Sequence, residues 1–471
     1  MLKYETNAGD SIMKELDSAI YDKYIKPTEK KRELSIGVEI EMPIVDLSGE
    51  PVEIETVLEV SENFRKHFGF IVQGRDDDGN INSISDNTNG DNLSFDCCYS
   101  NLELSMGIGS DLCEIHERFK KLYTFLQGEF AKHGYTLTGM GINPNYAVNY
   151  NKPVPNERYR MLYHYLHSYR KYQFELDRRF HEFPEFGTFT SASQVQLDVD
   201  KDLLIDTINT FGLLEPYKSL LFANSYLPEY PDYLCVRNML WERSMQGFNP
   251  HNVGMFSQKL GSIEELLEYI KSQSIYCTMR NGRYIDFRPV SVGEFFSCDK
   301  VRGEEFDGEK YKTVEFTPEK NDLQYLRTFK FEDLTFRGTI EYRSSCCQPI
   351  KDVMSVSALH TGLVGKLSEL KALLEADKVI YGHGYSPLEL QDMLSKTKLP
   401  DFIDTKSLKE QLINILDLAK AGLKARGKNE EHYLDVLFER AHSLTNPAKQ
   451  MLDGIKSGKT LKDYITEYSL V

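Results

Sequence analysis

The pattern of apolar and polar positions changes twice along this chain. Between residues 34 and about 345, short runs that alternate with a period of two are separated by runs with helical spacing. From residue 352 onward the alternation nearly disappears, and apolar residues follow helical spacing in five segments up to residue 456. Strands and helices followed by helices alone predict an α+β protein with a helical C-terminal part. We therefore divide the chain into a polar helical lead-in (1–33), a sheet with inserted helices (34–350) and a helical part packed on the same domain (351–471).

The clearest strand pattern is SIGVEIEM, residues 35–42. Ile36, Val38 and Ile40 alternate with Gly37, Glu39 and Glu41, so the apolar side chains can face a core while both glutamates share the opposite face. Same-face neighbours on a strand lie roughly 7 Å apart, and at an effective dielectric of about 20 their repulsion amounts to about 2 kcal/mol. Two carboxylates placed in this way need a charge that offsets them.

Three further segments carry the same one-sided polarity. Each one alone is typical of an antiparallel strand with a solvated face. Together they indicate a bound cation, because acids and amides dominate the polar positions. Oxygen donors without His or Cys select hard ions such as Mg²⁺ or Mn²⁺, and Mg²⁺ held by a few carboxylates keeps positions open for substrate phosphates. The pattern thus favours a metal–nucleotide platform on one sheet face. The polar positions are Asn101, Glu103 and Ser105 in SNLELS, Gln194, Gln196, Asp198 and Asp200 in SQVQLDVD, and Thr339, Glu341, Arg343 and Ser345 in GTIEYRSS.

Composition limits the class of protein. The 471 residues are 41% hydrophobic and 27% charged, which is ordinary for a globular protein, and the net charge of −16 argues against a nucleic-acid partner. No apolar run approaches the length of a membrane span, and no apolar segment follows a basic N-terminus, so we expect neither a membrane protein nor a secreted one. The eight cysteines include no CxxC pair, which indicates neither a disulfide scaffold nor a zinc site and favours the cytoplasm.

Two polar segments are interpreted as connections. GRDDDGNINSISDNTNGDN (74–92) is rich in turn residues and is predicted to be a loop between two strands. GIKSGKT (454–460) resembles a phosphate-binding loop, but it is one residue too short and follows a helical run instead of a strand. It is predicted to be a helix end at Gly454 followed by a turn.

Eight segments, in order, resemble the glutamate–cysteine ligase family, most closely its plant-type branch, which also occurs in bacteria. The resemblance covers roughly residues 33–465 and implies a fold related to that of glutamine synthetase. In that fold a strongly curved, mostly antiparallel sheet forms a funnel, the active site lies on its concave face, and helices pack outside. The segments are GVEIEM (37–42), NLELS (101–105), ERYRMLYHYL (157–166), SASQVQLDV (191–199), LLFANS (220–225), NGRYIDF (281–287), GTIEYRSS (338–345) and LAKAGLKARG (418–427).

The resemblance implies an ATP-dependent joining of the γ-carboxylate of L-glutamate to the amine of L-cysteine, through γ-glutamyl phosphate, as the first step of glutathione biosynthesis. It implies Mg²⁺, with Mn²⁺ as an alternative ion, and ATP as co-substrate. We expect a monomer or a homodimer. The main alternative is a γ-glutamyl ligase of the same fold that uses a different amino acid or amine. A phosphotransferase and a non-catalytic metal- or nucleotide-binding protein are more distant alternatives.

Site residues are carried over from the family position by position. Arg343, on the same strand face as Glu341, is expected to clamp the transferring phosphate, because a planar guanidinium suits phosphate oxygens. The alternative for Arg343 is a structural salt bridge with Glu341. As metal ligands the resemblance implies Glu39, Glu41, Asp96, Glu103, Gln194 and Glu341.

The substrate-binding residues come from two helical segments and one strand. Arg237 matches the arginine expected to bind the α-carboxylate of glutamate, and Trp241, one helical turn away, either walls that pocket or belongs to the core. Arg158 is expected to contact substrate or phosphate, the alternative being a solvated helix face. Ser105 completes the predicted substrate site.

The sequence departs from the family pattern at two places. Asp96 stands where plant-type members usually carry Glu one residue further upstream of Glu103, and SSCCQP (344–349) follows Arg343 in place of a small stretch with Gly and Asp. The second segment is expected to border the acceptor side of the site, so the acceptor amine is the least defined substrate.

Overall fold

A computed structural model of the chain describes residues 14–174 and 180–471. Its central element is a nine-stranded sheet in which all paired strands are antiparallel. The strand order is β14-β15-β7-β1-β5-β4-β3-β2, with β6 paired to β1. The strands are β1 (Ile36–Asp46), β2 (Ile71–Arg75), β3 (Ile81–Ser85), β4 (Asn92–Phe95), β5 (Asn101–Gly109), β6 (Tyr135–Leu137), β7 (Ser193–Asp198), β14 (Glu332–Leu334) and β15 (Thr339–Tyr342).

The four strands with one-sided polarity are adjacent in the sheet, as β15, β7, β1 and β5. Their register aligns the polar positions: Glu39 lies opposite Gln194 of β7, and Glu41 lies opposite Glu103 of β5. Because side chains on a strand alternate between faces, this register brings the predicted acids and amides to one face. The apolar positions of the same strands, among them Ile36 and Ile40, are fully buried on the other face.

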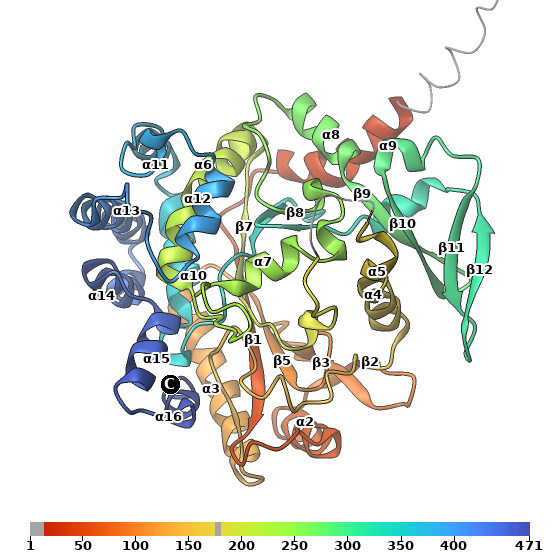
Figure 1. Cartoon of the computed structure of the whole chain (residues 1–471), viewed down its shortest axis with the longest axis horizontal. Helices are drawn as coiled ribbons and strands as arrows, with labels where there is room; N and C mark the ends of the chain where they lie inside the picture. The colour runs from red at the N-terminus through yellow and green to blue at the C-terminus, as the bar shows by residue number, and fades with distance from the viewer. Residues whose placement is uncertain (1–13, 175–179) are drawn as a thin grey trace, which may run out of the picture.

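Helices cover the sheet and form the whole C-terminal part, which confirms the predicted α+β class with a helical C-terminal region. The C-terminal helices, drawn in blue, lie together on one side of the molecule, opposite the small sheet β9–β12 (Figure 1). The main helices are α2 (Ile54–Phe68), α3 (Leu112–Ala131), α4 (Glu157–His167), α5 (Tyr169–Tyr172), α6 (Lys201–Phe222), α7 (Val236–Glu242), α8 (Ile263–Ser272), α9 (Val292–Phe295), α10 (Met354–Val364), α11 (Leu367–Glu375), α12 (Pro387–Leu394), α13 (Thr405–Arg426), α14 (Asp435–Ser443), α15 (Pro447–Lys456) and α16 (Leu461–Glu467).

One hydrophobic core joins the sheet to the C-terminal helices and includes Leu16, Ile20 and Ile25 of the lead-in. Within this core α10 and α13 cross at two glycines. A Cβ at Gly362 would lie 2.2 Å from the carbonyl oxygen of Ala419, and a Cβ at Gly422 would lie 1.9 Å from that of Gly362. Only residues without a side chain allow the two backbones to approach this closely.

Two smaller sheets and the lead-in lie beside the central sheet. The lead-in is helical over 14–20, continues as the π-helical turn η1 (Tyr21–Ile25) and ends in η2 (Lys26–Glu29). The four-stranded sheet consists of β9 (Ser274–Arg280), β10 (Arg283–Ser291), β11 (Val301–Phe306) and β12 (Tyr311–Phe316), and a two-stranded parallel sheet pairs β8 (Val253–Gly254) with β13 (Phe329–Lys330). Within the ranges that the structure describes, no helix is both long and apolar enough to cross a membrane.

Two details of the sequence interpretation are wrong. The segment 74–92 is not a loop, because it contains the end of β2 and the whole of β3, whose Ile84 is buried in the core. The helix predicted to end at Gly454 continues to Lys456. Gly454 serves packing instead, since a Cβ there would lie 1.7 Å from the phenol oxygen of Tyr464 in α16.

Candidate active site

A cavity of about 650 Å³ opens over the polar face of the central sheet. Its walls also include residues of α4, α7, the lead-in and the segment 324–329. All but one of the predicted site residues line it, and the exception is Ser105. The predicted residues in the cavity wall are Glu39, Glu41, Asp96, Glu103, Arg158, Gln194, Arg237, Trp241, Glu341 and Arg343.

Gln194 links the two glutamates of β1. Its amide nitrogen donates to Glu39 Oε1 and to Glu41 Oε1, both at 2.7 Å, while its own Oε1 is buried without a hydrogen-bond partner. The second carboxylate oxygen of Glu41 accepts the backbone N–H of Ala192 at 2.7 Å. The amide therefore separates two carboxylates that would otherwise repel each other directly, and it leaves a carbonyl oxygen free to bind a cation.

A second pair of acids lies beside the first. Asp96 follows β4, directly before Cys97, which adopts a positive φ of 59°. Glu103 of β5 accepts a hydrogen bond from Ser105 Oγ at 2.6 Å. Ser105 thus holds Glu103 in place from outside the cavity wall, and Tyr159 of α4 donates to Asp96 at 3.4 Å.

Burial and mutual repulsion raise the pKa values of these carboxyl groups. Burial and Glu103 raise the pKa of Glu39 well above its ordinary value. Burial and Asp96 raise the pKa of Glu41 to about 8 and that of Glu103 to about 7. Burial also raises the pKa of Asp96, against the opposing charge of Arg158. Four carboxyl groups that resist ionisation on one sheet face form a site whose charges a cation would stabilise.

Glu341 and Arg343 of the β15 segment form an ion pair at the cavity wall. Arg343 Nη1 lies 2.7 Å from Glu341 Oε2, and the two side chains are 24% and 9% exposed. The guanidinium carbon of Arg343 also lies 5.2 Å from the ring centroid of Phe329, another residue of the wall. The pair is therefore mostly buried. Arg343 both pairs with Glu341 and faces the cavity.

Arg237 and Trp241 lie one turn apart on α7 and both reach the cavity. Arg237 Nη1 donates to the backbone carbonyl of Arg343 at 3.0 Å, and its Nε is buried without a hydrogen-bond partner. Trp241 stacks on Phe329 with a centroid distance of 3.9 Å and meets Phe186 edge-on at 4.6 Å. Trp241 thus belongs to the core and to the wall at once, and its indole N–H is likewise without a partner.

The two arginines of α4 have different surroundings, because residues two apart on a helix are separated by about half a turn and lie on opposite faces. Arg158 lines the cavity, where its charge acts on Asp96 and Glu103. Arg160 instead pairs with Glu157 at 2.8 Å and with Asp77, outside the cavity wall.

Four polar residues illustrate the part of the wall that was not singled out from the sequence. Gln196 was placed on the polar face, and it donates to Glu341 Oε1 at 2.8 Å. Asp333 of β14 lies opposite Glu341, and burial raises its pKa to about 6. The remaining two, Lys23 and Arg327, come from the lead-in and from an irregular segment before β13. A three-residue strand and irregular segments give no periodic signal, so only Gln196 could have been found by its pattern.

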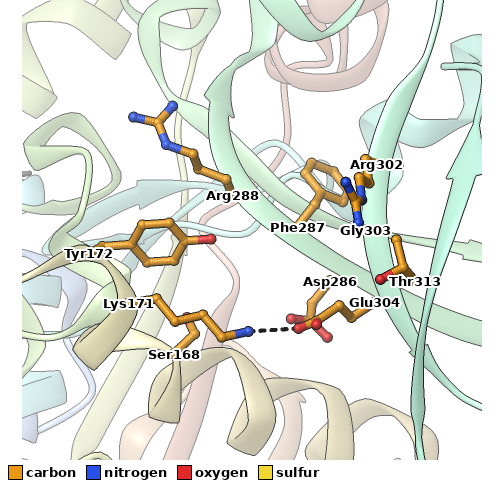
Figure 2. A pocket seen from close by; sticks show the side chains of 10 residues that line it. All are labelled: Ser168, Lys171, Tyr172, Asp286, Phe287, Arg288, Arg302, Gly303, Glu304 and Thr313. Carbon is orange, nitrogen blue, oxygen red and sulfur yellow. Dashed lines mark hydrogen bonds and ion pairs between the residues drawn. The ribbon is translucent and has the colours of Figure 1, made fainter.

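A second, smaller cavity of about 290 Å³ lies between α4–α5 and the sheet β10–β12 (Figure 2). At its acidic end His164, Asp286 and Glu304 bring ligand atoms within 4.8 Å of one another. These groups already bind each other, with His164 Nδ1 at 2.9 Å from Asp286, and Lys171 Nζ lies 2.8 Å from Glu304. A cation would have to displace the Lys171 ammonium, so this cluster is best described as an ion network that fixes α4 and α5 on the small sheet.

The sequence profile of glutamate–cysteine ligase family 2 (GCS2) matches residues 35–467. The chain belongs to this family. The match includes every predicted site residue and the C-terminal helices, and it begins after the lead-in.

Curated relatives include chloroplastic glutamate–cysteine ligases of Brassica juncea, 24% identical over 333 residues, and Nicotiana tabacum, 25% identical over 330 residues. Each alignment covers 68% of this chain and 58% of the relative, so the chain matches less than two thirds of these proteins. Among solved structures, a glutamate–cysteine ligase from Francisella tularensis in complex with AMP is similar, with a TM-score of 0.47 and 12% identity over 93% of this chain and 88% of that one.

Proposed function

We propose that this protein joins the γ-carboxylate of L-glutamate to the amine of L-cysteine at the expense of ATP, the first step of glutathione biosynthesis. The observation that carries the proposal is the face-to-face arrangement of charges in one 650 Å³ cavity. Carboxylates of β1, β5 and β15 form its floor together with amides of β7, and Arg158, Arg237 and Arg343 reach it from α4, α7 and the end of β15. An amino acid and a metal-bound triphosphate need both kinds of charge. In a member of glutamate–cysteine ligase family 2, this arrangement supports the family's reaction.

The donor set suits Mg²⁺. The candidate ligands are Glu39, Glu41, Asp96, Glu103, Gln194 and Glu341, and all of them offer oxygen. These acids are spread along the sheet face and do not gather into one compact group, unlike the His164 cluster among the described residues. That spacing fits Mg²⁺, because this ion usually takes one or two protein carboxylates and completes its shell with substrate phosphates and water. When bound, Mg²⁺ would neutralise charge on the ATP phosphates.

The chain's own residues would position the two reacting groups. We assign Arg343 to the transferring phosphoryl group, with Glu341 holding its guanidinium in place at 2.7 Å. Arg237 would bind the α-carboxylate of glutamate, since its buried Nε has no protein acceptor. Trp241 would wall that pocket, and Arg158 would meet substrate or phosphate at the cavity rim. In the reaction, transfer of the γ-phosphoryl group to glutamate forms γ-glutamyl phosphate, and attack by the amine then releases phosphate.

The acceptor amine is the open part of the proposal, and the segment after Arg343 bears on it. Ser344, Ser345, Cys346 and Cys347 are all buried, and none of them is part of the cavity wall. The unusual SSCCQP stretch therefore does not contact a substrate in the cavity and can affect the site only through the residues that line it. This leaves cysteine as the first candidate, with another amino acid or amine as the alternative.

The proposal is tested by phosphate release from ATP with Mg²⁺, glutamate and a panel of amines. We expect phosphate release with cysteine, together with a product that carries a γ-glutamyl amide detectable by mass spectrometry. Turnover with another amine alone would select the alternative ligase. Phosphate recovered on a stable product would indicate a phosphotransferase, and binding of ATP without turnover would indicate a binding protein. The Glu39→Gln variant serves as the matched inactive control.

A further inference from the structure

The lead-in contributes a lysine to the cavity. Lys23 lies in the π-helical turn η1, and its Nζ donates to the carbonyl of Leu323 at 2.6 Å. It lines the cavity together with Tyr24, twelve residues before the family match begins at residue 35. π-helical turns are rare in proteins, and those that do occur are frequently found at functional sites. A residue outside the family's matched region thus reaches the family's site.

Lys23 is held next to a second cation. Burial and the charge of Arg327 lower the pKa of Lys23 to about 8. Arg327 also lines the cavity; its Nη2 donates to Tyr284 at 2.8 Å, and its Nε is buried without an acceptor. The carboxylate that acts on Lys23 is Asp333, which also accepts a hydrogen bond from Thr328 at 2.8 Å.

Asp333 does not neutralise this corner of the cavity. The charges of Arg343 and Lys330 act on it as well as that of Lys23, so this carboxylate is shared among three cationic groups, with Glu341 as its acidic neighbour. Two like charges that are partly removed from water repel each other strongly, and an anion placed between them relieves the repulsion. The acidic floor shows the same effect with opposite charges, because the carboxylates gathered there favour a cation.

We infer that Lys23 and Arg327 form a binding subsite for an anionic group of a substrate. The inference rests on the proposed function, which supplies two anions of suitable chemistry: the α-carboxylate of the acceptor amino acid and the ATP triphosphate. In either case the lead-in is part of the substrate site and sets one of the Michaelis constants. Lys23 binds substrate here and takes no part in proton or phosphoryl transfer.

The experiment compares Lys23→Met with Lys26→Met, a matched control on the same segment. Lys26 is exposed, forms an ion pair with Asp22 at 2.9 Å one turn away, and is not part of the cavity wall. Steady-state constants are measured for ATP, glutamate and cysteine, and again with cysteamine, an amine acceptor that lacks a carboxylate. Loss of one charge-assisted hydrogen bond predicts an increase of about 10- to 100-fold in one KM, with kcat changed less than about threefold. Lys23→Arg should restore most of the loss, and Arg327→Gln should raise the same KM.

The two sources of the anion give different results. If the subsite binds the acceptor carboxylate, Lys23→Met raises the KM for cysteine and leaves that for cysteamine unchanged. If it binds the triphosphate, the KM for ATP rises with either acceptor. Three KM values equal to those of the Lys26→Met control would overturn the inference, and so would a loss confined to kcat. Calorimetric titration of wild type and Lys23→Met with ATP and with each amino acid tests the subsite separately, even if the wild type turns over none of the amines.

Discussion

Replacing Arg343 by lysine separates a catalytic clamp from a structural ion pair. Lysine keeps the positive charge and can still pair with Glu341, which now lies 2.7 Å from Nη1. Its single ammonium group cannot bind Glu341 through one nitrogen and present the N–H donors of a second nitrogen to a phosphoryl group, as the planar guanidinium can. If Arg343 stabilises the transferring group, loss of that donor lowers kcat by about 10²–10³, equivalent to about 3–4 kcal/mol, while the KM values for ATP and glutamate change little.

The structural alternative predicts a much smaller effect. Because lysine keeps the charge and can still pair with Glu341, a pure ion pair would lose only part of its stabilising energy, and that loss would appear in the free energy of unfolding and not in turnover. The matched control is Arg160→Lys: Arg160 has the same 24% side-chain exposure and pairs with Glu157 at 2.8 Å, but it lies outside the cavity wall. We measure kcat by phosphate release and the free energy of unfolding by urea titration for both variants. An Arg343→Lys protein that keeps more than about a third of the wild-type kcat would refute the clamp assignment.

Three further predictions address the acids and the packing. Glu39→Gln should abolish most turnover and leave the metal-free melting temperature unchanged or slightly higher, because burial already raises the pKa of Glu39; a drop of more than about 5 °C with activity retained would show a structural role. Burial raises the pKa of Glu332 well above 4.5, so unfolding releases its proton and the free energy of unfolding falls as pH rises from about 4.5. Glu332→Gln should remove up to about 1.4 kcal/mol per pH unit of that fall at pH values between about 4.5 and the raised pKa, and an unchanged slope contradicts a neutral Glu332. Gly362→Ala should cost about 1–3 kcal/mol, because its Cβ meets the Ala419 carbonyl, whereas Gly212→Ala, with nothing within 4 Å, should stabilise α6 by about 0.5–1 kcal/mol; equal urea midpoints would contradict this contrast.

The sheet and most of the cavity floor could be predicted because a strand fixes its side chains with a period of two. Once Ile36, Val38 and Ile40 are assigned to the core, Glu39 and Glu41 must share the other face, and the observed register aligns them with Gln194 and Glu103. The pattern could not predict how deeply the residues on the polar face of the sheet are buried. The mostly buried Arg343–Glu341 pair depends on what packs above the sheet, and no local pattern records that.

The wall residues that were not predicted also lie where the sequence gives no periodic pattern. Asp333 sits in a three-residue strand, and Arg327 precedes a strand of only two residues. Lys23 reaches the cavity through a π-helical turn that shifts the ordinary helical phase. The position of Lys23 is set by a contact between segments 300 residues apart, its bond to Leu323, which no short window of sequence contains.

The strand order also has a consequence for how the protein is made. β7 lies between β1 and β15, so it stays an edge strand, with unpaired N–H and C=O groups, until residues 339–342 have been synthesised. A ribosome-bound or truncated chain that stops before β15 exposes this edge next to the acidic face, and pairings over such long sequence separations form slowly. The nascent chain is thus most open to aggregation during synthesis of the stretch between β7 and β15. A chaperone that shields the β7 edge during that interval would therefore raise the yield of folded protein.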